Sequence, residues 1–182
     1  MKETDIIPEI KYSRAGSRTV MDTGPVSGML MAQVLSSPYW CRPFFAGSLR
    51  EVPSPTQALL WQSGDVYSFL LPLSISYSAW LEGSSEGLLL VTGVSDSREP
   101  VPGAVLAKGR DPYAIIRQAF KSAAELARIP TRRDKRLPGF AEYLGWCTWD
   151  AMEIWVDSRG IMDKLREFKE KDVPVRWILI DD

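Results

Sequence analysis

The C-terminal part of the chain alternates strand, helix and strand, and this pattern constrains the fold more than any other feature of the sequence. Residues 143–148 form a short apolar run, residues 158–171 carry an apolar helical face, and residues 175–180 (V-R-W-I-L-I) have few polar positions. A strand of the last kind is typical of a parallel sheet covered by helices. The pattern predicts one right-handed βαβ unit. Because one unit supplies no neighbours for such a strand, we expect an N-terminal fragment of a larger protein, ending in the start of a parallel α/β domain.

The longer N-terminal part, residues 6–109, consists of short β-like runs separated by Gly, Pro and Ser. The strand candidates are residues 57–62, 66–71, 74–81 and 87–92. Ser63-Gly64-Asp65 is the expected hairpin turn between the first two. Successive strands joined by short turns predict an antiparallel sheet or sandwich. Residues 36–55 are punctuated by proline and arginine, and we expect them to form a long loop.

A helix is predicted to follow the strands. Asp111 is a good N-cap, and Pro112 stands at the first helical position, where its missing N–H costs nothing. The expected apolar face recurs at spacings of three and four residues and consists of Tyr113, Ile116, Phe120, Ala123 and Ala127. Pro130 is expected to end the helix. The basic run at residues 128–136 fits a solvated linker better than a phosphate or nucleic-acid contact, because the total charge is close to neutral.

These changes of pattern predict an α+β, multidomain fold with three parts. We expect a β-sandwich-type domain at residues 1–109, a linker helix and basic linker at residues 110–142, and a truncated parallel domain at residues 143–182.

The composition excludes several classes of function. Lys plus Arg is 22 and Asp plus Glu is 23, so the formal net charge of -1 argues against binding nucleic acid or membrane by bulk charge. The chain has no His, which excludes Ser-His-Asp and Cys-His catalysis and His-ligated metal sites within it. Its two cysteines, Cys41 and Cys147, suit a reducing compartment, so we expect a cytoplasmic protein. We also expect no signal peptide and no membrane span.

Aromatic and acidic residues gather where the two predicted parallel strands end, which is where α/β domains bind their ligands. They are Trp146, Trp149, Asp150, Asp181 and Asp182. An indole stacks on the C–H face of a sugar, and carboxylates accept hydrogen bonds from its hydroxyls, so the set predicts a sugar-binding rim. Adjacent aspartates are poorly arranged as the two catalytic carboxylates of a retaining glycosidase, which lie about 5–5.5 Å apart across the anomeric carbon. We therefore interpret the Asp pair as hydroxyl-binding groups.

Other roles stay open for these residues. The Asp pair also suits a solvated or helix-capping position, and paired carboxylates suit a divalent cation. A Trp inside a strand is usually a core residue, which is our interpretation of Trp177, while Trp146 fits either the core or the site. Trp155 fits a surface or loop-packing position.

Several motifs resemble one family. They are G-W-C-T-W-D-A at residues 145–151, V-D-S-R-G at residues 156–160 and I-L-I-D-D at residues 178–182. This set is similar to the raffinose synthase and seed imbibition family, relatives of the α-galactosidases of the glycoside hydrolase family 36 group. G-R-D-P-Y at residues 109–113 and C-R-P-F-F at residues 41–45 are similar as well. The resemblance implies a β-sandwich-type domain, a linker helix and the first βαβ unit of a (β/α)8 TIM barrel.

The resemblance also implies a function. Trp149 would pack against the sugar, and Asp181 and Asp182 would bind galactose hydroxyls. The nucleophile and the acid/base would be Asp residues on later barrel strands, so no catalytic residue is expected in this chain, which also lacks the Gly-Trp that normally follows the Asp pair.

We therefore expect part of a retaining α-galactosidase or of a galactosyltransferase of raffinose-family oligosaccharides, inactive by itself. The complete enzyme would act on an α-galactoside or oligosaccharide through a covalent galactosyl intermediate, without metal or organic cofactor. The alternative is a non-catalytic sugar-binding or structural protein that retains the fold. The sequence leaves the oligomeric state open.

Overall fold

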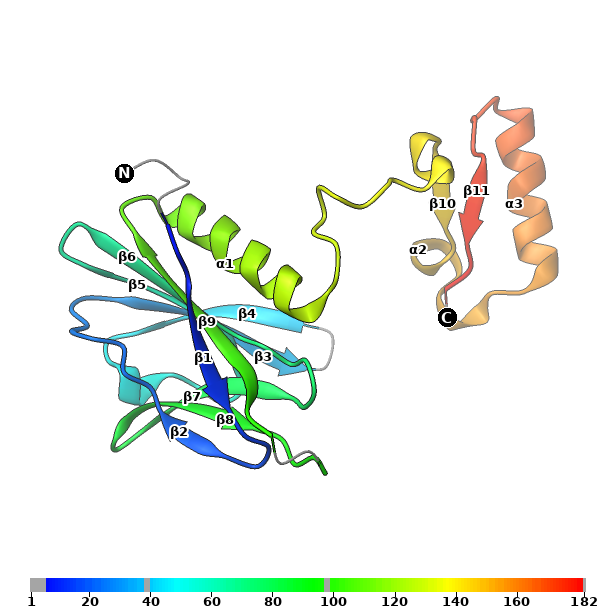
Figure 1. Cartoon of the computed structure of the whole chain (residues 1–182). Helices are drawn as coiled ribbons and strands as arrows, with labels where there is room; N and C mark the ends of the chain where they lie inside the picture. Colours follow the sequence, from blue (N-terminus) through cyan, green and yellow to red (C-terminus); the bar gives the residue numbers. More distant parts are fainter. Residues whose placement is uncertain (1–5, 38–39, 97–98, 182) are drawn as a thin grey trace. The chain divides into compact units, whose positions relative to one another are not determined.

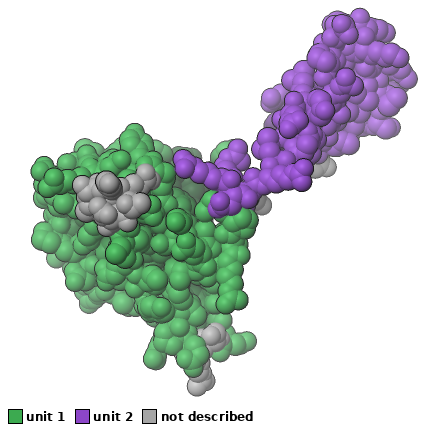
Figure 2. All heavy atoms as spheres, turned by 45° about the horizontal axis from the view of Figure 1, so that its top comes forward, with its two compact units in different colours: residues 1–131 green, residues 132–182 purple. Residues whose placement is uncertain are grey.

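The computed structural model of the chain describes residues 6–37, 40–96 and 99–181. The chain forms two compact units, residues 1–131 and residues 132–182 (Figures 1 and 2). No helix in the described part of the chain is long and apolar enough to cross a membrane.

Unit 1 is a mostly antiparallel sheet that curves nearly into a barrel (Figure 1). Its strands are β1 (Glu9–Ser13), β2 (Arg18–Val20), β3 (Leu30–Ser37), β4 (Trp40–Ala46), β5 (Thr56–Ser63), β6 (Val66–Pro72), β7 (Ala79–Ser84), β8 (Gly87–Thr92) and β9 (Val101–Gly109). The main path of pairing runs β1-β9-β6-β5-β7-β8-β2, and β3 lies between β5 and β4. A short 3-10 turn, η2 (Leu49–Glu51), follows β4. The predicted antiparallel sheet is therefore confirmed, as one continuous hydrogen-bonded sheet.

The predicted hairpin forms from β5 and β6. Ser63 pairs with Val66 across the turn. Gly64 has a φ of 59°, a conformation that glycine adopts without steric cost. The strand predicted at residues 87–92 is also confirmed, as β8.

The loop predicted at residues 36–55 is wrong, because it contains β4. Pro43 and the arginines suggested a loop, yet β4 pairs antiparallel with β3, with Gln33 opposite Pro43. Among the described residues β4 pairs as a strand only with β3, so its other side is an edge of the sheet. A proline is tolerated on an edge strand, where no further ladder needs its N–H.

The strand predicted at residues 74–81 starts later than expected, because β7 begins at Ala79. The Ser74 hydroxyl accepts a hydrogen bond from the Ala79 N–H at 3.0 Å, so a side chain replaces a ladder partner there. Tyr77 is nevertheless buried, and its hydroxyl donates to the Ser13 carbonyl at 2.6 Å. Ile75 and Tyr77, which alternate with serines as in a strand, therefore lie in a loop before β7.

The predicted helix forms as α1 (Pro112–Ala127). Asp111 caps it as expected, accepting hydrogen bonds from the N–H groups of Tyr113 and Ala114. Arg128, in the left-handed conformation at a φ of 55°, follows the last helical residue, so the helix ends before Pro130.

The predicted apolar face of α1 is only partly right, because Ile116 and Ala123 are partly buried against the sheet whereas its largest members are exposed. Tyr113 and Phe120 are 73% and 52% exposed. The buried side chains are Ala114, Ile115, Ala119 and Ala124. Small alanines let the helix approach the sheet closely, which the spacing of the larger apolar residues did not show.

Two apolar clusters hold unit 1 together, one on each face of the central strands. One contains Leu59, Trp61, Leu70, Leu90 and Leu106. In the other, Phe69, Val105 and Ala107 of β6 and β9 pack with Ile115 and Ala119 of α1. Neighbouring residues of β6 and β9 point to opposite clusters, as the period of a strand requires. Thus α1 is part of unit 1, and the predicted boundaries at residues 109 and 142 stay predictions.

Unit 2 contains the predicted strand, helix and strand. Its elements are η3 (Gly139–Glu142), β10 (Gly145–Cys147), α2 (Trp149–Met152), η4 (Glu153–Trp155), α3 (Ser158–Glu170) and β11 (Trp177–Leu179). β10 and β11 pair in parallel, with Trp146 opposite Ile178. Asp157 caps α3 by accepting the Gly160 N–H at 2.6 Å. The parallel βαβ connection is therefore present, whereas the assignment to a TIM barrel stays a prediction.

Candidate functional site

The C-terminal ends of β10 and β11 are joined through Thr148. Its N–H donates to the Leu179 carbonyl at 3.0 Å and continues the parallel ladder past the last strand residue. Its hydroxyl then accepts the Asp181 N–H at 3.0 Å and donates to the Asp181 carbonyl at 3.1 Å. Thr148 is fully buried, while Asp181 is exposed. These bonds bring Asp181 beside the residues that follow β10.

Trp149 and Asp150 follow Thr148 directly and form the first turn of α2. Trp149 is 43% exposed and Asp150 is exposed as well. We call the group formed by Thr148, Trp149, Asp150 and Asp181 the rim. Asp182, the second member of the predicted Asp pair, lies outside the described residues.

Trp146 lies inside β10 and is half-buried. Its ring packs edge-on against Phe168 of α3, with the centroids 5.3 Å apart and an interplanar angle of 79°. This contact joins the strand to the helix that crosses over it.

Trp177 lies at the start of β11. Its indole N–H donates to the Tyr143 carbonyl at 3.0 Å, and its ring packs edge-on against Phe140 at 5.2 Å. These contacts tie β11 to the segment before β10, in keeping with the interpretation of Trp177 as a packing residue. Trp155, in contrast, is 79% exposed.

The rim carries few candidate metal ligands. The Cys147 thiol lies 3.9 Å from a carboxylate oxygen of Asp181. Within the described residues no group of three or more His, Cys, Asp and Glu side chains could hold a metal ion. Both cysteines, Cys41 and Cys147, are free and exposed. The chemistry that the described rim offers is hydrogen bonding by carboxylates and stacking on an indole.

Two carboxylates outside the rim have pKa values lowered by their neighbours. Burial opposes the charge of Glu82, but hydrogen bonds from Ser54, Trp80 and Arg18 outweigh it and hold the pKa of Glu82 below its usual value. Hydrogen bonds from Lys164 and Lys171 lower the pKa of Glu167, on α3, to about 2. Glu82 joins β7 to β2 through its ion pair with Arg18, whereas both ion pairs of Glu167 lie within α3 and its C-cap, and neither carboxylate belongs to the rim.

Sequence reasoning missed Thr148, the residue that joins the two strands. Its signal was a polar residue at the end of an apolar run, inside the W-C-T-W motif. A threonine there reads as an ordinary helix N-cap, and only the structure shows its hydroxyl bonded to Asp181.

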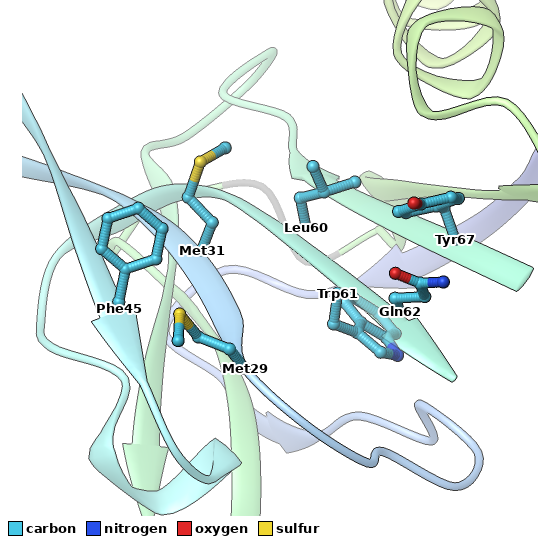
Figure 3. A pocket seen from close by; sticks show the side chains of 7 residues that line it. All are labelled: Met29, Met31, Phe45, Leu60, Trp61, Gln62 and Tyr67. Atoms are coloured by element: carbon cyan, nitrogen blue, oxygen red, sulfur yellow. The ribbon is translucent and has the colours of Figure 1, made fainter. Parts of the chain in front are cut away.

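A hollow on the face of the sheet in unit 1 is a further feature that sequence reasoning did not identify (Figure 3). It lies over β3, β4, β5 and β6, with Met29 just before β3. The apolar and aromatic side chains around it include Met29, Met31, Phe45, Leu60 and Tyr67. Its lining contains no carboxylate and no amine. Unlike the rim, it therefore offers no charged group that could bind a sugar hydroxyl.

The chain is thus a protein of mixed α and β structure in two compact units, an antiparallel β unit and a βαβ unit. The chain belongs to the family described as raffinose synthase or seed imbibition protein Sip1, whose profile matches residues 40–182. The resemblance that the motifs indicated is therefore confirmed over most of the chain.

Individual relatives match along much of the chain. A probable galactinol–sucrose galactosyltransferase 6 of Arabidopsis thaliana is 29% identical over 157 residues, covering 73% of this chain and 21% of the relative. A galactinol–sucrose galactosyltransferase of Pisum sativum is 26% identical over 183 residues, covering 93% of this chain and 23% of the relative. A stachyose synthase of Pisum sativum is 32% identical over 73 residues, covering 40% of this chain and 9% of the relative. The chain thus spans a quarter or less of the length of these three curated relatives.

Proposed function

We propose that this chain is the N-terminal part of an enzyme that transfers galactosyl groups from α-galactosides, and that its rim forms part of the site for the galactosyl group. The observation that carries the proposal is the rim itself: Thr148 brings Asp181 beside Trp149 in a chain whose family match extends through both. The names of the relatives, galactinol–sucrose galactosyltransferase and stachyose synthase, favour transfer to a sugar acceptor over hydrolysis.

Unit 2 is proposed to be the first βαβ unit of a (β/α)8 barrel. Among its described residues only Thr148 is buried. The apolar side chains of Leu144, Leu179 and Ile180 are 53%, 51% and 64% exposed, although they lie in or next to the parallel strands. Such strands are normally covered on both faces, and further barrel strands and helices would cover these side chains.

The rim residues divide the recognition of galactose between them. Trp149 presents an exposed indole for stacking on the C–H face of the ring. Asp181, together with Asp182, accepts hydrogen bonds from neighbouring hydroxyls, and Asp150 supplies a further carboxylate. Trp146, packed on Phe168, supports β10 from the helix side of the unit.

The chain contributes binding groups and leaves the bond chemistry to residues elsewhere in the enzyme. In a double displacement, a carboxylate nucleophile attacks the anomeric carbon while an acid protonates the leaving oxygen. The deprotonated acid then takes a proton from the acceptor hydroxyl as that hydroxyl displaces the carboxylate. The nucleophile and acid are proposed to lie on later barrel strands, and no metal or organic cofactor is required.

The test compares the full-length gene product with the 182-residue chain, both supplied with galactinol and sucrose. We expect galactosyl transfer by the full-length protein and none by the chain alone, which should also leave an aryl α-galactoside unhydrolysed. Turnover by the 182-residue chain would contradict the division between binding and catalytic parts. Sugar binding without any turnover by the full-length protein would favour the non-catalytic alternative.

A further inference from the structure

Thr148 is the only buried residue among the described residues of unit 2, and it is polar. Burying a hydroxyl is unfavourable unless it is hydrogen-bonded. A valine would fill nearly the same volume without that requirement. The hydrogen bonds of the Thr148 hydroxyl should therefore explain why this position is threonine.

The hydroxyl of Thr148 does not cap the helix that it precedes. Thr148 is the N-cap residue of α2, a position at which threonine normally accepts a helix N–H through its side chain. Its side chain makes no such bond. Instead the hydroxyl bonds to both the N–H and the carbonyl of Asp181, at 3.0 and 3.1 Å.

These two bonds tie two backbone groups of Asp181 to a single hydroxyl. Its N–H and its carbonyl belong to different peptide groups, so binding both restricts φ and ψ of Asp181 together. β11 ends at Leu179, so Asp181 lies beyond the strand and its ladder. The Thr148 side chain thus fixes the backbone from which the Asp181 carboxylate extends.

We infer that Thr148 is a positioning residue for sugar recognition, acting through the backbone of Asp181. The inference rests on the proposed function of the rim. A carboxylate that distinguishes one hydroxyl from its epimer must be held in place, because a displacement of about 1 Å can reduce a rate by about 100-fold. Loss of the hydroxyl should therefore reduce selectivity for galactose as well as stability.

The variants are Thr148→Val, which removes the hydroxyl, and Thr148→Ser, which keeps it. Thr92→Val is the matched control, because Thr92 of β8 is also buried and its hydroxyl donates to the backbone, at 2.6 Å from the Arg14 carbonyl. Asp181→Ala tests the proposed function itself. All are made in the full-length protein. The readouts are amide exchange at Asp181 and the ratio of kcat/KM for a galactosyl donor to that for its glucosyl epimer.

We expect Thr148→Val to speed exchange of the Asp181 amide and to lower the selectivity ratio by about 10- to 100-fold. Thr148→Ser should stay close to the parent, and Thr92→Val should lower stability while keeping the ratio. An unchanged ratio in Thr148→Val, with a reduced ratio in Asp181→Ala, overturns the positioning role and leaves the proposed function standing. An unchanged ratio in Asp181→Ala overturns both. Equal loss of selectivity in Thr148→Val and Thr92→Val also overturns the positioning role.

Discussion

The indole of Trp177 lies directly against the backbone of Gly145, its register partner on the neighbouring parallel strand. A Cβ built on Gly145 would come within 2.1 Å of a ring atom of Trp177. Real side chains do not approach so closely, so only glycine fits at this position while the ring stays where it is. The first residue of the G-W-C-T-W-D motif is therefore explained by the packing of a residue on β11.

Gly145→Ala should destabilise unit 2. The added methyl group must displace the Trp177 ring or separate the strands, and overpacking of this kind costs about 1–3 kcal/mol. The effect should be measured as faster amide exchange at Arg176, whose N–H donates to the Leu144 carbonyl at 2.8 Å. Gly139→Ala is the matched control, because no atom lies within 4 Å of a Cβ at that position.

A second variant tests the cause of the expected loss. Trp177→Leu removes the ring, so the double variant should lose less stability than the sum of the two single variants. Simple additivity would mean that the ring is not what excludes a side chain at residue 145.

Amide exchange should differ between the two units of the 182-residue chain. The strands β5, β6 and β8 carry buried residues such as Leu59, Leu70 and Leu90, whereas β10 and β11 carry none. Local opening is easiest where few apolar contacts are lost. We expect residues 143–181 to exchange faster than residues 57–92. Equal protection would contradict the proposal that unit 2 needs further barrel elements.

The sequence predicted those parts of the fold that depend on local chemistry. The Asp111 cap depends only on neighbouring residues, as does the Gly64 turn between β5 and β6. The parallel pairing of β10 with β11 could be predicted because an apolar strand, a helix and another apolar strand follow one another directly.

The parts that were wrong or missed depend on residues far apart in the chain. β4 is strand because β3 pairs with it, although its own residues are mostly exposed and include Pro43. The buried face of α1 is set by the close approach of Ala119 to the sheet. Thr148 becomes informative only when Asp181, which follows much later in the sequence, is seen bonded to its hydroxyl.

Glu82 provides a prediction for the pH dependence of unit 1. Its side chain is 14% exposed and lies on β7, where it pairs with Arg18 of β2 and accepts the Ser54 hydroxyl at 2.7 Å. Glu82→Gln should cost about 1 kcal/mol at neutral pH, because the amide keeps a neutral acceptor but loses the charge that strengthens these hydrogen bonds. Glu86→Gln, at an exposed position between β7 and β8, is the control.

The difference between the parent and Glu82→Gln should depend on pH in one direction. Because the pKa of Glu82 is lowered on folding, its carboxylate stabilises the fold above the ordinary value near 4.5. That contribution is lost as the pH falls through the lowered pKa. The free energies of unfolding of the parent and of Glu82→Gln should therefore converge in acid. Amide exchange at Leu81, measured as a function of pH, reports both free energies. A gap that stays constant at all pH values would show that the charge of Glu82 is not what stabilises the sheet.

The rim offers the most direct prediction about sugar binding. In a full-length protein whose nucleophile has been removed, Asp181→Ala should weaken galactose binding by about 1.5–3 kcal/mol, or about 10- to 150-fold. Trp149→Ala should also weaken binding, through the loss of stacked area, and should change the preference between galactose and glucose less than Asp181→Ala does. Asp181→Ala should reduce the preference for galactose, because a carboxylate placed for one hydroxyl discriminates against the isomer that misplaces it.

The control for charge is Asp163→Ala, which removes an exposed carboxylate of α3 that is paired with Arg166. It should leave both affinities unchanged. Trp177→Phe should lower stability without altering the preference, since its ring packs on Gly145 and Phe140 and not at the rim. Calorimetric titration of each variant with galactose and with glucose measures the two affinities, and their ratio gives the preference for galactose. If Asp181→Ala and Asp182→Ala both bind galactose as tightly as the parent does, the rim is not the galactose site, because both proposed hydroxyl-binding carboxylates would then be without effect.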